Sequence, residues 1–231
     1  MRPAFLRSLR TVLWEVAIAV AGFVIFAPAA AGANPKDPQK RHTAADTRVA
    51  KSIALKKSDL QAGWTADRST ATDNSTICSA QPDESKLVET ADVDPSFTYK
   101  DKVTNIGSEV QLFRTAANAR TDWRFITLAA LKTCVVEEMR QELGKGARAE
   151  VTAAKELPLH ASTERVFQYR FALTLHVGSK TVPVVLEFVG LGKGRASVFF
   201  HVVRFGSPPP ASFLTPFVRV FAARLNAAPA I

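Results

Sequence analysis

Residues 163–204, TERVFQYRFALTLHVGSKTVPVVLEFVGLGKGRASVFFHVVR, decide the fold because they predict three consecutive strands. In each strand, apolar residues recur at every second position, which is the pattern of a half-buried strand. The residues expected on the inward face are Phe167, Tyr169, Phe171, Leu173, Leu175, Val177, Val182, Val184, Leu186, Phe188, Ala196, Val198, Phe200 and Val202. One apolar sheet face results, and other parts of the chain must cover it.

Glycines separate these strands. Gly178 and Ser179 are expected to turn the chain after the first strand, and Gly190, Gly192 and Gly194 to form a hairpin turn after the second. A glycine loop can also bind phosphate through its backbone N–H groups. This string has neither the GxGxxG order followed by a helix nor the GxxxxGK[ST] order, so we interpret it as a turn.

The strand register decides which polar residues share the second face of this sheet. If matching apolar faces set the register, Val177 lies opposite Val182. His176 and His201 then both flank Pro183 on the second face, about 10 Å apart. That separation is too large for one metal ion unless the two side chains lean together, but it suits the wall of a polar cleft.

The same register places Phe188 opposite Ala196, and Glu187 diagonal to Arg170, within reach of a salt bridge. The candidate ligand-binding residues are therefore Arg170, His176, Glu187 and His201. Two alternatives remain open. One is a solvated sheet face with an incidental ion pair, and the other is a catalytic site.

The rest of the chain predicts further strands and the helices that cover the sheet. Helical patterns cover 43–57, 116–143 and a segment from Pro216 onward, and strands are expected from Trp64, over 97–99, over 107–114 and around 148–155. The fold class is therefore α+β. We expect an antiparallel sheet of about five to six strands, covered by one long helix and a C-terminal helix.

The N-terminus has the pattern of a signal peptide over 1–33. Three arginines precede an apolar run at 16–27, and small residues at 31–33 suit cleavage after the last of them. The alternative is an uncleaved membrane anchor, although the apolar run is short of the roughly 20 residues that a spanning helix needs. We expect a flexible linker at 34–43, a single globular domain at 44–231, and a secreted, periplasmic or cell-envelope location.

Cys78 and Cys134 are the two cysteines of the chain, and both follow the expected leader. In an oxidising compartment they are expected to form a disulfide. The alternative, a redox or nucleophilic thiol, has no CxxC motif or nearby histidine to support it.

The chain is basic, with a formal net charge of +9, and loss of three arginines and Glu15 with the leader leaves +7. This charge suits an anionic envelope polymer. It is spread along the chain without the basic stripe and interleaved aromatics typical of nucleic-acid binding, so we expect no nucleic-acid partner. We also expect a monomer that does not span a membrane after cleavage.

No short motif predicts a cofactor or an enzyme class. The four histidines, His42, His160, His176 and His201, show neither HxH nor HExxH spacing, so we predict no metal site. GxSxG and SxxK motifs are absent from the sequence. An active site assembled from distant residues remains an alternative, because catalytic triads are defined by geometry.

The order of features resembles a group of actinobacterial exported proteins with PsbP-like domains, which includes small lipoproteins and the extracellular sensor domains of serine/threonine kinases. The resemblance covers most of 44–226 and rests on the strings DLQAGW at 59–64 and VQLFRTAA at 110–117, on Cys78 and Cys134, and on the closing three-strand meander. It implies a PsbP-like α/β sandwich with a cleft that binds a ligand without chemistry. The chain departs from the lipoproteins in lacking a lipid-accepting cysteine, and from the kinase sensors in lacking a kinase domain.

These observations lead to one expectation and two alternatives. We expect an exported, non-catalytic ligand-binding or sensor-like domain at the cell envelope, with a small apolar or lipid-like ligand. One alternative is a secreted hydrolase with a dispersed active site. The other is adhesion to anionic envelope polymers through the basic surface, which would weaken steeply with added salt.

Overall fold

A computed structural model describes residues 35–67, 78–143, 147–177 and 179–228. The expected leader at 1–33 and the turn residue Gly178 lie outside the described residues. The strands are β1 (Gln39–Lys40), β2 (Trp64–Ala66), β3 (Val88–Val93), β4 (Ser96–Tyr99), β5 (Thr104–Phe113), β6 (Ala147–Glu156), β7 (Arg165–Val177), β8 (Lys180–Lys193) and β9 (Ala196–Phe205). The helices are α2 (Ala44–Ile53), α3 (Ala116–Phe125), α4 (Leu128–Leu143) and α5 (Thr215–Ala227), with short 3₁₀ turns at Lys57–Asp59 and Ala211–Phe213.

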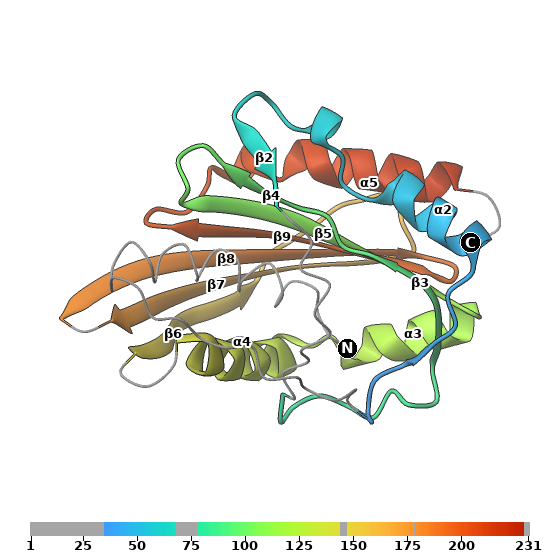
Figure 1. Ribbon diagram of the computed structural model, residues 1–231, viewed down its shortest axis with the longest axis horizontal. Helices are drawn as coiled ribbons and strands as arrows, with labels where there is room; N and C mark the ends of the chain where they lie inside the picture. The colour runs from blue at the N-terminus through green and yellow to red at the C-terminus, as the bar shows by residue number, and fades with distance from the viewer. Residues whose placement is uncertain (1–34, 68–77, 144–146, 178, 229–231) are drawn as a thin grey trace.

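The described elements form three layers, with one sheet between two pairs of helices (Figure 1). Helices α2 and α5 cover one face, and α3 and α4 cover the other. We call these the α2/α5 face and the α3/α4 face. Each has its own apolar core, so both the α+β class and the covering of the sheet by helices are confirmed.

The sheet has nine strands in the described part of the chain, where about five to six were expected. Their order is β1-β3-β5-β9-β8-β7-β6, and β4 pairs with both β5 and β2. The pairs are antiparallel except for β1, which lies parallel to β3. Strand β1 falls inside the segment expected as a linker, and the Arg41 N–H donates to the Glu89 carbonyl at 2.8 Å.

The closing meander is confirmed, but its expected register is wrong. Val177 pairs with Lys180 rather than Val182, and Phe188 pairs with His201 rather than Ala196. The second turn is also shorter than expected, because β8 continues through Lys193 before the chain reverses.

Two glycines assigned to that turn instead lie inside β8. The ring of Phe167 lies over Gly190, where an added Cβ would be 2.2 Å from a ring carbon. The guanidinium of Arg165 covers Gly192 in the same way. These glycines therefore provide space for the side chains of β7, and only Gly194 is in the turn, at φ 51°.

The long helix expected at 116–143 is two helices. The first, α3, begins where predicted, because Thr115 Oγ1 accepts a hydrogen bond from Asn118 N at 3.1 Å. It ends at Phe125, and Thr127 caps the next helix by accepting from Ala130 N at 3.2 Å. A new cap of this kind starts a helix in a new direction, which lets α3 and α4 follow different strands of the sheet.

The Cys78–Cys134 disulfide is present and joins α4 to the segment before β3. Beside it, Glu137 accepts hydrogen bonds from Ser79 N at 2.7 Å and Ser79 Oγ at 2.5 Å. Among the described residues, no helix is long and apolar enough to cross a membrane.

The two faces are covered to different extents. Every residue of β5 is buried, as are nine of the ten residues of β9, so these central strands are covered on both faces. Strand β7 differs, because Phe171 and its neighbours on the α3/α4 face are buried, whereas Arg170 and its neighbours on the other face are half-buried. The α2/α5 face is therefore incompletely covered at β7.

Candidate functional site

The structure brings together two of the four candidate residues. Arg170 and Glu187 lie directly opposite each other on β7 and β8, on the α2/α5 face. His176 shares that face but pairs with Thr181, and its Nε2 lies 4.0 Å from Glu150 Oε2. The prediction that both histidines flank Pro183 on one face is wrong.

His201 lies on the opposite face of the sheet. It is 3% exposed, pairs with Phe188 and packs over Gly107, where an added Cβ would be 2.5 Å from its ring. Burial lowers the pKa of His201 to about 3, so its imidazole is neutral at physiological pH. It is therefore part of the α3/α4 core and cannot share a cleft with Arg170.

The Arg170–Glu187 pair is held tightly. Glu187 Oε1 accepts from Arg170 Nε at 2.7 Å and Nη2 at 2.6 Å, and Glu187 Oε2 accepts from Gln168 Nε2 at 3.3 Å. The Glu187 side chain is 2% exposed and that of Arg170 is 24% exposed. The carboxylate therefore lies beneath the guanidinium and fixes its position, with part of the guanidinium at the surface.

A groove of about 520 Å³ opens above this pair. Its floor is the half-buried face of β7, one wall is the segment that follows β6, and the other is the first turns of α5. The residues that line it are Leu157, Pro158, Leu159, His160, Gln168, Arg170, Leu214, Thr215, Val218 and Arg219. Its volume is within the range of small-molecule sites.

The first wall, residues 157–160, is attached at both ends. Leu157 N donates to the Gln168 carbonyl at 2.8 Å, and the side chain of Leu159 packs against the α2/α5 core. Further along, Asn226 Nδ2, at the end of α5, donates to the Ser162 carbonyl at 2.8 Å. This wall therefore has a defined position relative to α5, and the groove between them is built into the fold.

The second wall comes from α5. Leu214 and Val218 are buried and present apolar surface, and Thr215 and Arg219 are exposed. Thr215 and Arg219 are four residues apart and so lie one above the other on one side of the helix. The helix itself was predicted, together with the burial of its inward residues. Its role as a groove wall was not, because no local motif marks one.

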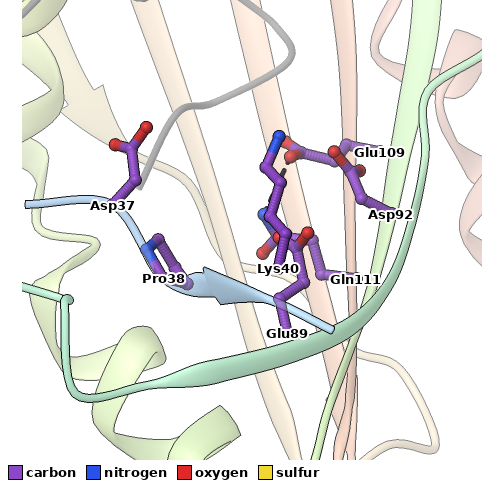
Figure 2. Close-up of a pocket in the computed structure, with 7 residues that line it drawn as sticks. All are labelled: Asp37, Pro38, Lys40, Glu89, Asp92, Glu109 and Gln111. Atoms are coloured by element: carbon purple, nitrogen blue, oxygen red, sulfur yellow. Dashed lines mark hydrogen bonds between the residues drawn. The ribbon is translucent and has the colours of Figure 1, made fainter. Parts of the chain in front are cut away.

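A second, much smaller cavity lies between β1, β3 and β5, and Figure 2 shows Lys40 extending from β1 toward Glu109 of β5. Glu89 and Asp92 of β3 also line it, and Gln111 Nε2 donates to Glu109 Oε1 at 2.8 Å. Its volume of about 10 Å³ is enough for roughly one water molecule. No three His, Cys, Asp or Glu side chains among the described residues come close enough to hold a metal ion.

The lining of the groove combines apolar residues with histidine, glutamine, threonine and arginine side chains. It includes no carboxylate and no cysteine. A hydrolase would place His176 or His201 within reach of a nucleophile and beside a carboxylate such as Glu187, but the described partners of Glu187 are Arg170 and Gln168. When the chain is compared with protein-family models and with curated proteins, neither comparison finds a match.

Proposed function

We propose that this chain is an exported, non-catalytic binding domain that holds a small apolar or amphipathic molecule in the groove between β7, residues 157–160 and α5. The observation that carries the proposal is the groove itself, with about 520 Å³ of space above the fixed Arg170–Glu187 pair. Half of its lining is apolar, and the remaining lining residues are polar or cationic. This composition is typical of small-molecule sites, in which a few polar groups orient a mostly apolar ligand.

Two further observations support an exported binding role. The Cys78–Cys134 disulfide suits an oxidising compartment outside the cytoplasm. The resemblance to actinobacterial PsbP-like domains, based on the strings at 59–64 and 110–117, also implies a cleft that binds without chemistry. We propose that the domain acts at the cell envelope as a ligand carrier or sensor.

Occlusion of the groove tests this function. Thr215 is exposed and lines the groove, so Thr215→Trp should fill it with little effect on the core. The matched control is Ala129→Trp, an exposed position on α4 beyond the opposite face. The readout is the fluorescence of 1-anilinonaphthalene-8-sulfonate, which reports access to apolar surface.

We expect wild type and Ala129→Trp to bind the dye equally and Thr215→Trp to bind it at least tenfold more weakly. Equal binding by all three proteins would contradict the proposed site. Native mass spectrometry of the mature protein, purified gently from its host, complements this test. A retained small molecule that is lost in Thr215→Trp would support the proposal and identify the ligand class.

A further inference from the structure

We infer that the ligand of the groove is an alkyl-chain molecule with an anionic oxyacid headgroup, a carboxylate or a phosphate, and that Arg219 of α5 is the main headgroup contact. This inference rests on the proposed function, because it names the class of molecule that the same groove would take. It is carried by the distribution of charge around the groove.

The charged residues that line the groove are cationic. These residues are Arg170 and Arg219, and no aspartate or glutamate lines the groove. An anion bound in the groove would therefore be close to positive charge and would face no carboxylate of the lining. The lining is therefore complementary to a negatively charged group and would reject a ligand with a cationic head.

The two arginines differ in how far their charge is already balanced. Arg170 is paired with buried Glu187, so most of its charge is offset within the protein. Arg219 is exposed and makes no ion pair or hydrogen bond with another described residue. As far as the described part of the chain goes, its guanidinium can therefore form two parallel hydrogen bonds to a carboxylate or phosphate without first losing a partner.

The start of α5 adds to this preference. Thr215 is the first residue of the helix and lies on the same wall, one turn before Arg219. The N-terminal end of a helix favours negative charge, because its first N–H groups have no partners within the helix. The headgroup is thus expected beside Thr215 and Arg219.

The apolar residues of the lining indicate that the rest of the ligand is apolar. Leu157, Pro158 and Leu159 lie on one wall and Leu214 and Val218 on the other, so an alkyl chain would have apolar contacts on both sides. The volume of about 520 Å³ is within the range of sites that hold small molecules. A ten-carbon chain with its headgroup therefore fits.

The test compares three probes that share a ten-carbon chain, namely decanol, decanoate and decyl phosphate, with inorganic phosphate as a fourth arm. Each is titrated below its aggregation concentration by calorimetry into wild type, Arg219→Gln and Arg124→Gln. Arg124 is an exposed arginine on α3, at the opposite face, and serves as the matched control.

For wild type and Arg124→Gln, we expect one or both anionic amphiphiles to bind at least tenfold more tightly than decanol, and inorganic phosphate to show no binding. In Arg219→Gln this advantage should fall to about threefold or less, with decanol affinity unchanged. Which anion binds more tightly identifies the headgroup as carboxylate or phosphate.

Two outcomes would overturn the inference while leaving the proposed function intact: decanol binding as tightly as both anions, or an anion advantage that survives Arg219→Gln. Tight binding of inorganic phosphate alone would replace the amphiphile with a phosphate site and would also overturn it. If none of the chain-bearing probes binds, the proposed function itself fails.

Discussion

Loss of the Cys78–Cys134 disulfide is expected to destabilise the domain by about 4 kcal/mol. The two cysteines are 56 residues apart. In the chain-entropy model, closing a loop of that length removes roughly 14 cal/mol/K from the unfolded chain, which is about 4 kcal/mol at 25 °C. The perturbation is the double substitution Cys78→Ser with Cys134→Ser, which leaves no unpaired thiol.

Urea unfolding followed by tryptophan fluorescence measures the effect. The double variant and the reduced wild type should show the same loss of unfolding free energy, because both lack the same link. In hydrogen exchange, α4 should lose more protection than α5, since the bond attaches α4 and not α5 to the rest of the chain. A loss below about 1 kcal/mol in both samples would refute the assigned role.

Three further substitutions test the sheet by urea unfolding. Gly190→Ala places a Cβ 2.2 Å from the Phe167 ring and should cost about 1–3 kcal/mol. The pKa of His201 is about 3 in the folded protein, whereas the ordinary value for histidine is 6.5. The unfolded chain therefore binds a proton more readily, and wild type should lose stability as the pH falls below 6.5, by about 2 kcal/mol at pH 5. The His201→Phe variant should not show this loss. Glu187→Gln leaves Arg170 without its counter-charge and should cost about 2 kcal/mol; an unchanged midpoint would contradict the importance of the pair.

Local pattern was enough to predict most elements of the fold. Strand β7 places large apolar residues at every second position from Phe167 to Leu175, and α5 buries Phe217, Phe221 and Leu225 at helical spacing, so both were predicted. With two cysteines in the chain, one pairing was available, and it formed. Strands β1 and β3 were not predicted, because β1 has two residues and β3, with the sequence VETADV, does not alternate strictly between apolar and polar residues.

The candidate site was predicted only in part, because register could not be derived from apolar alternation in β8 and β9. Both faces of these strands are buried, so apolar residues occur at successive positions and two opposite assignments of face satisfy the pattern. In the structure, Phe188 faces the α3/α4 core, whereas Val198 faces the α2/α5 core. The residues expected on one inward face therefore belong to both faces of the sheet. As a result, His201 was assigned to the wrong face, whereas the pairing of Arg170 with Glu187 was predicted correctly.

The position of the groove follows from the same difference between strands. Strands β8 and β9 are buried on both faces over most of their length, and their sequences show little alternation; β7 is covered fully on one face, and its other face carries Gln168 and Arg170. When one strand alternates between apolar and polar residues and its neighbours do not, that strand therefore lies where the helices stop covering one face of the sheet. Here α5 borders that strip of β7, and residues 157–160 return across it, so the half-covered floor becomes a groove with two walls. The polar face of β7 is thus a part of the meander where a ligand could contact the sheet without displacing a helix.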